Sequence, residues 1–119
     1  MIGTECFCVE QSGDVTIVRI FDTRSFDTDG YAQLQQDLVD FVAHHQPRKL
    51  LVDLGNIEYC STALIAALLM AQKCIQTCAG TMKLFGLSEV VLESLQHLKL
   101  IDTVFSVCAD EAGAKHACA

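Results

Sequence analysis

The stretch KLLVDLGNIEYCSTALIAALL, residues 49–69, decides the fold. Its first part, Leu50-Leu51-Val52, lacks the polar alternation of a half-buried strand, which indicates a strand covered on both faces. Gly55-Asn56 then turns the chain. Strong helix formers follow over residues 61–79, and Gly80 is expected to end that helix. Crossovers of this length suit parallel pairing of the strands that they join.

Outward from this unit, strands and helices alternate along the chain. The sequence predicts strands over residues 6–11 and 15–21, joined by a Ser-Gly-Asp hairpin turn. Apolar residues spaced three and four apart predict a helix over residues 30–45, which Pro47 ends. The remaining expected elements are a strand over 81–85, a helix capped by Ser88, a short strand over 104–107 and a helical turn or two over 110–117.

This order predicts a single α/β domain over residues 1–119. We expect a mixed sheet of four or five strands, antiparallel in the opening hairpin and parallel afterwards, with helices packed on it. The strand over residues 49–54 should be central, because its side chains need cover from both faces.

Composition limits the class of protein. The chain has 119 residues, of which 51% are apolar, so it can bury a core. The longest apolar run, residues 62–71, is about half of the ~20 residues that a membrane span needs. The first ten residues do not resemble a secretory signal, so we expect a cytoplasmic protein. With eight basic and fifteen acidic residues, the net charge is −7, which favours a protein partner over nucleic acid.

The chain contains seven cysteines. In a cytoplasmic protein they should be reduced, and their spacing does not match the paired knuckles of a zinc fold. Cys74 and Cys78 would share one helix face and could hold a metal, but two buried thiols are the better interpretation. We therefore expect no native disulfide, no stoichiometric metal and no cofactor.

The hydroxyl pair Ser61-Thr62 stands at the start of the second helix. Ser61 is placed to cap the helix, and the same position would hold a regulatory phosphate whose charge expels a partner. One apolar stripe can face the sheet; it comprises Leu64, Ala67, Leu68, Ala71, Ile75 and Cys78. Ile65, Leu69 and Met70 lie off this stripe. Either a second element covers these residues or they form an exposed apolar patch; we expect the patch, with Ile65 and Leu69 contributing to a docking surface beside a solvent-accessible Ser61.

Nearly the whole chain resembles the STAS domain of bacterial anti-sigma factor antagonists. In that family a strand similar to residues 50–54 leads to an Asp-Ser-Ser/Thr-Gly-Leu motif that opens the second helix. This chain has Cys60-Ser61-Thr62-Ala63-Leu64 at that place. Further on, Gly80 before a strand, then Ser88 with the helix and turn over 90–100, follow the family's order.

The resemblance implies a function and a site. Ser61 matches the family's phosphorylated serine, and Thr62 is the second choice. Family members bind an anti-sigma factor that is also a serine kinase; when unphosphorylated, they capture it and free the sigma factor. Partner contacts are accordingly expected at Cys60, Ser61, Thr62, Ile65 and Leu69.

Two motif positions differ from the family pattern, since Cys60 replaces the aspartate and Ala63 replaces the glycine. The family's Leu-Thr-Gly-Glu-Leu-Asp stretch after the second strand is also replaced, by residues 20–27. One alternative is therefore a STAS-like scaffold or sensor-binding module that is not phosphorylated. A second is an enzyme with Cys60 as a nucleophile activated by the helix N-terminus. We expect no enzyme, because the histidines are scattered and no glycine-rich phosphate loop is present.

Overall fold

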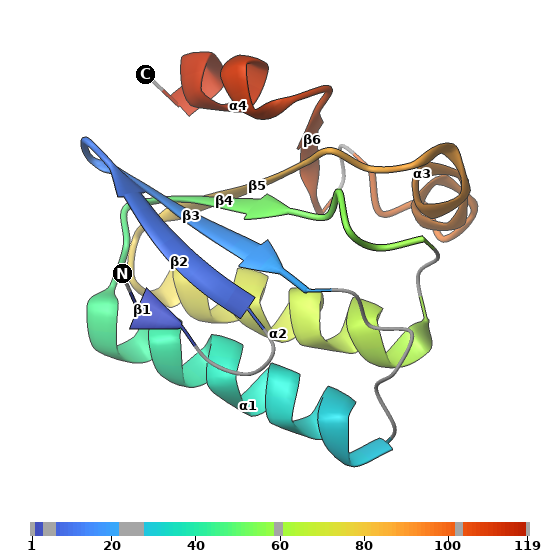
Figure 1. Ribbon diagram of the computed structural model, residues 1–119, viewed down its shortest axis with the longest axis horizontal. Coiled ribbons are helices and arrows are strands. Elements are labelled where there is room, and N and C mark those ends of the chain that lie inside the picture. Colours follow the sequence, from blue (N-terminus) through green and yellow to red (C-terminus); the bar gives the residue numbers. More distant parts are fainter. Residues whose placement is uncertain (1, 4–6, 22–27, 59–60, 102–103, 119) are drawn as a thin grey trace.

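The computed structural model describes residues 2–3, 7–21, 28–58, 61–101 and 104–118 (Figure 1). Its strands are β1 (Ile2–Gly3), β2 (Phe7–Ser12), β3 (Val15–Ile20), β4 (Lys49–Asp53), β5 (Thr81–Phe85) and β6 (Ser106–Cys108). Its helices are α1 (Thr28–His45), α2 (Thr62–Thr77), α3 (Glu89–His97) and α4 (Glu111–Cys118). All predicted elements are present, although several begin or end a few residues away from the predicted positions.

The described strands form one mixed sheet in the order β1-β2-β3-β4-β5-β6. β2 and β3 form an antiparallel hairpin, and Gly13 in its turn has a φ of 62°, a left-handed conformation that glycine adopts readily. From β3 to β6 each neighbouring pair is parallel. The predicted α/β class and mixed sheet are confirmed. Within the described residues, the two-residue β1 adds a strand that the sequence did not predict, by pairing with Cys8 and Val9 of β2.

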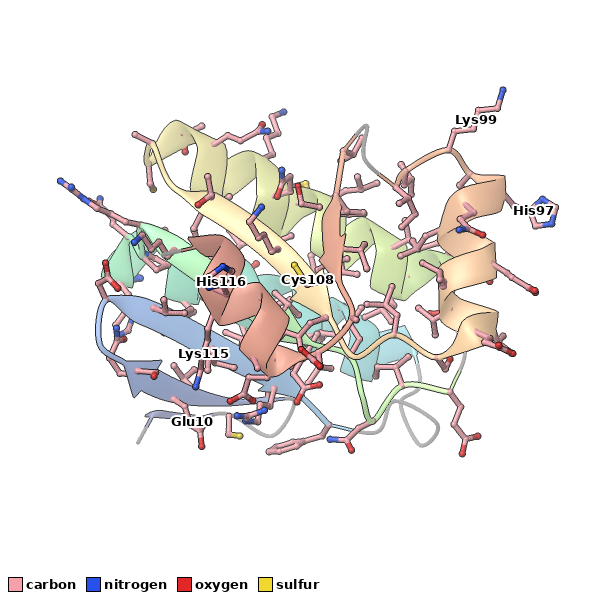
Figure 2. The ribbon with its side chains drawn as sticks, turned by 90° about the horizontal axis from the view of Figure 1, so that it is seen from above. Glu10, His97, Lys99, Cys108, Lys115 and His116 are labelled. Atoms are coloured by element: carbon pink, nitrogen blue, oxygen red, sulfur yellow. The ribbon has the colours of Figure 1, made fainter. Side chains whose placement is uncertain are left out.

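Helices cover both faces of the sheet (Figure 1). α1 and α2 lie side by side against one face, here called the lower face, and α3 joins this core through Val91 and Leu95. α4 lies across the opposite, upper face, with Cys108 of β6 beside it (Figure 2). Within the described part of the chain, no helix combines the length and apolar character needed to cross a membrane.

Strand β4 is central, with β3 on one side and β5 on the other. Leu50 and Val52 point into the lower core, whereas Leu51 points into a smaller cluster under α4. All three side chains are buried. Cover from both faces explains why no polar residue alternates along this strand, and the predicted central position of β4 is confirmed.

The end of α2 differs from the expectation. The helix ends at Thr77 with Cys78 as its C-cap, not at residue 79, and the left-handed residue is Ala79, with a φ of 59°. Gly80 is instead required by close packing. A Cβ atom on Gly80 would lie 2.6 Å from the Pro47 carbonyl oxygen and 2.9 Å from Ile75 Cγ1, closer than atoms can pack. Gly80 therefore allows the end of α2 to pack closely against the loop before β4.

The starts of two other elements also differ from the predicted positions. α1 begins at Thr28 instead of residue 30. β6 begins at Ser106 instead of residue 104, because Val104 N and Phe105 N both donate to the Leu100 carbonyl oxygen, at 3.1 and 2.9 Å. These bonds form a turn where the sequence predicted the start of a strand.

Leu51→Ala should lower the free energy of unfolding by about 2–5 kcal/mol, because it removes a side chain that is 0% exposed. Leu98→Ala is the matched control: its side chain is 56% exposed, and the change should be about 0.5 kcal/mol or less. Urea denaturation followed by circular dichroism measures both values. Equal losses in the two variants would contradict the burial of β4 beneath α4.

Candidate functional site

The carboxyl ends of β4 and β5 are held close together. Asp53 Oδ1 accepts a hydrogen bond from Gly55 N at 2.8 Å, which shapes the turn after β4. Gly86, directly after β5, has a φ of 75°, and a Cβ atom there would lie 3.2 Å from the same Asp53 oxygen and 3.4 Å from Gly55 N. Two glycines therefore let both chain segments approach the Asp53 carboxylate. This end of the sheet is where the chain enters α2 and α3.

Ser61 is the N-cap of α2, as predicted. Its backbone is extended, with φ −80° and ψ 160°, and its Oγ accepts a hydrogen bond from Leu64 N at 3.1 Å. The Ser61 carbonyl oxygen accepts the first helical bond, from Ile65 N, at 3.1 Å. The residue is half-buried, so solvent still reaches it. Cys60, the neighbouring motif position and the thiol that the enzyme alternative requires, lies outside the described residues.

Ser88 caps α3 in the same way, and this prediction is also confirmed. Its Oγ accepts a hydrogen bond from Val91 N at 3.3 Å. The Ser88 hydroxyl also donates a long bond, 3.5 Å, to the carbonyl oxygen of Glu58, three residues before Ser61 in the chain. The N-terminus of α3 is thereby joined to the segment that leads into α2, a contact between distant residues that the sequence analysis did not predict.

The outward side of α2 is partly apolar. Thr62 is exposed, and Leu69 lies seven residues further on, so the two face the same way about 10 Å apart. Leu69 is 36% exposed and Met70 is 42% exposed. We call Ser61, Thr62, Leu69 and Met70 the α2 surface.

The expectation that Ile65 is exposed is wrong. Ile65 is 8% exposed and belongs to the lower core. Gln72, seven residues later on the same side of α2, donates from Nε2 to the Val104 carbonyl oxygen at 3.1 Å. That side of the helix therefore faces the segment between α3 and β6. The prediction assumed that only the stripe of α2 toward the sheet is buried. The buried part of the helix surface is wider than that stripe, because other segments cover the helix as well.

The start of α2 carries no acidic residue in its first turn. The positive end of the helix dipole is thus not offset by a carboxylate from the helix itself, which favours an anion at this place. Among the thiols, burial and the nearby Cys78 raise the pKa of Cys74 on α2. A raised pKa leaves less of the nucleophilic thiolate at neutral pH.

Arg19 of β3 anchors the Asp53 carboxylate. Its Nη1 donates to Asp53 Oδ2 at 2.8 Å, and its Nη2 donates to Glu10 Oε2 at 2.6 Å and to Glu111 Oε1 at 2.7 Å. Hydrogen bonds to Glu10 and Glu111 raise the pKa of the Arg19 guanidinium. The bond to Arg19, and a second one to Lys115, lower the pKa of the Glu111 carboxyl. One guanidinium thus joins β2, β3, β4 and α4.

This cluster was not predicted from the sequence. A signal was present, because Arg19 and Asp53 are charged residues near the carboxyl ends of two mainly apolar strands. They are also direct neighbours in the parallel register of β3 and β4. That register, which places the two side chains together, follows only once the pairing of the strands is known.

Comparisons with known proteins agree with this architecture. A family model described as "Mlab, STAS domain" matches residues 9–104. Comparison with curated proteins finds no match. Among solved structures, an anti-sigma-factor antagonist (STAS) domain protein from Planctomyces limnophilus has 24% identity and a TM-score of 0.76, with 95% of this chain and 97% of that chain covered.

Two further structures share the fold at lower identity. RsbS from Moorella thermoacetica, in a serine-to-glutamate variant, has 13% identity and a TM-score of 0.78, covering 96% of this chain and 94% of that one. The Bacillus cell fate determinant SpoIIAA in its phosphorylated form has 12% identity and a TM-score of 0.65, covering 93% and 98%. These likenesses establish the fold, and the match over residues 9–104 establishes the family: the chain belongs to the STAS domain family.

Proposed function

We propose that this protein is an anti-sigma factor antagonist, which captures an anti-sigma factor of the serine-kinase type through the α2 surface. Phosphorylation of Ser61 would release that partner. The observation that carries the proposal is the place of Ser61, a half-buried hydroxyl at the N-terminus of α2, on the helix that also presents Leu69 and Met70 to solvent. Apolar side chains at a polar surface are typical of protein-docking sites.

The proposed switch follows from the charge of a phosphate. A phosphoryl group adds about −1.5 to −2 charges at pH 7, and the backbone N–H groups at a helix start can hold it. The first turn of α2 has no acidic residue to repel it. The domain would therefore stay folded when Ser61 is modified. A partner whose interface extends along α2 from Leu69 to Ser61 would have to take that charge out of water, which costs several kcal/mol unless a cation compensates.

The relatives support the proposal in two ways. The Planctomyces protein is described as an anti-sigma-factor antagonist, and the Bacillus protein is described in a phosphorylated form. In addition, Ser61 stands in the segment that resembles the family's phosphorylated motif, which makes it our candidate for the modified residue.

A second candidate function is a scaffold or sensor-binding STAS module that keeps its partner without phosphorylation. Three observations favour it. The Ser61 hydroxyl already serves as the helix cap, Cys60 stands where the family has an aspartate, and the matching family model is not described as an anti-sigma factor antagonist. Both candidates use the α2 surface, and they differ in whether Ser61 accepts a phosphate.

Phosphate transfer separates the two candidates. Incubation of the protein with Mg-ATP and the serine-kinase anti-sigma factor of its source organism should add one phosphate, located on Ser61 by peptide mass spectrometry. Ser61→Ala should accept none, and Thr62→Ala should be modified as the wild type is. Tight binding without any transfer would favour the scaffold, and a phosphate on Thr62 would show that the wrong hydroxyl was chosen.

Charge at residue 61 should control affinity. Ser61→Asp should weaken partner binding by about tenfold, or ~1.4 kcal/mol, in isothermal titration calorimetry. Ser61→Ala should bind as the wild type does, yet lose about 1 kcal/mol of stability, because Leu64 N loses its acceptor. Ser88→Ala, which removes the equivalent cap of α3, is the control for stability alone. Unchanged binding by Ser61→Asp would refute the switch.

The apolar part of the α2 surface should matter for binding more than for folding. Met70→Asp should weaken capture of the same anti-sigma factor by about tenfold or more, because Met70 is 42% exposed and available to a partner. Its free energy of unfolding should change by about 0.5 kcal/mol or less. Leu98→Asp, at an exposed position on the far end of α3, is the matched control and should bind normally. Equal binding by both variants would place the partner elsewhere.

A further inference from the structure

A cavity of about 880 Å³ lies between the tip of the β2–β3 hairpin and the C-terminal end of α1. The loop from α1 to β4, with Pro47 and Arg48, closes a third side. In Figure 1, α1 ends at the opposite end of the sheet from the start of α2. The cavity is therefore separate from the α2 surface, and its volume falls in the range of about 300–1,000 Å³ typical of small-molecule sites.

The wall toward the core is apolar and partly aromatic. Val9 of β2 and Phe41 of α1 are buried side chains that line the cavity. The ring of His45 is stacked on the ring of Phe41, with 4.4 Å between centroids and 28° between planes. His45 Nδ1 donates to the Phe41 carbonyl oxygen at 3.2 Å, which fixes the ring. The result is a flat, held surface of the kind against which planar rings stack.

A polar pair lines the same cavity from the sheet. Thr16 is the one polar side chain among the buried residues of the described chain, and its hydroxyl donates to Gln11 Oε1 at 2.9 Å. Gln11 Nε2 in turn donates to the Gly13 carbonyl oxygen at 3.0 Å. Because these groups are hydrogen-bonded to one another, this wall of the cavity is already formed without a ligand.

The charges around the cavity leave one cation unmatched. Glu10 is paired with Arg19 at 2.6 Å, and Asp14 is paired with Lys49 at 3.0 Å. Among the described residues, Arg48 makes no ion pair, although its backbone is held because its carbonyl oxygen accepts Thr81 N at 2.8 Å. A guanidinium without a carboxylate partner, beside an aromatic surface, favours an anionic ligand.

We propose that this cavity binds a small planar organic anion, an aromatic carboxylate or sulfonate. The ring would stack on His45 and cover Val9, and the anionic group would accept hydrogen bonds from the Arg48 guanidinium. Such a site gives the domain an input for a small molecule at the end of the sheet opposite Ser61. It does not depend on the function proposed for the α2 surface.

The test uses 8-anilinonaphthalene-1-sulfonate as the probe, with fluorescence titration of the full chain and amide chemical shifts of the ¹⁵N-labelled protein. Saturable binding of one probe per chain is expected, with the largest shifts at Gln11, Thr16, Arg48 and Lys49. Arg48→Glu should weaken binding about tenfold or more, and His45→Ala about threefold. Lys73→Glu, which makes the same change in net charge on the exposed side of α2, should bind within about twofold of the wild type. The uncharged analogue N-phenyl-1-naphthylamine should bind more weakly than the sulfonate.

Each other result overturns the proposal. Equal weakening in Arg48→Glu and Lys73→Glu would show that the probe senses only net charge. Largest shifts at Leu69 and Met70 would place the probe on the α2 surface. Equal affinity for the charged and uncharged probes would show that Arg48 does not bind the sulfonate group. Circular dichroism of each variant shows that it is folded, so a loss of binding can be assigned to the site.

Discussion

The ion pair between Arg19 and Asp53 joins β3 to the carboxyl end of β4, where the chain leaves the sheet toward α2. Asp53 uses its second oxygen to hold Gly55 N at 2.8 Å, so one carboxylate fixes both the strand and the turn that follows. The same guanidinium reaches Glu111 and so ties α4 to the upper face. These bonds order the strand and the turn at the end of the sheet from which the chain proceeds toward α2 and the proposed docking surface.

The two ends of the sheet have different chemistry. At one end the helix starts of α2 and α3 offer hydroxyl caps, Ser61 and Ser88, and no acidic residue in the first turn of α2. At the other end α1 finishes in the stacked pair Phe41 and His45, beside the loop that holds Arg48. The proposed docking surface and the proposed small-molecule cavity thus lie at opposite ends of one small domain and do not overlap.

Local signals predicted much of this fold from the sequence. The apolar run Leu50-Leu51-Val52 indicated a central strand, and Ser61 and Ser88 were recognised as caps, because each signal lies within a few residues of its effect.

The features that were missed all depend on contacts between distant segments. Ile65 is buried because segments beyond the sheet also cover α2, and Gly80 is required because Pro47 approaches it. The Arg19 cluster draws residues from β2, β3, β4 and α4, and the Arg48 cavity needs the hairpin and α1 to meet. None of these can be deduced from periodicity along one element, because the register and packing of separate elements decide them.

The most direct test of the central claim is an amide chemical-shift map of the ¹⁵N-labelled protein upon addition of the proposed partner, a serine-kinase anti-sigma factor of the source organism. The account predicts that the largest changes fall on Ser61, Thr62, Leu69 and Met70, and that they disappear when Ser61 carries a phosphate. Changes centred on α4 or on the outer edge of β6, with the amides of the α2 surface unaffected, would contradict it.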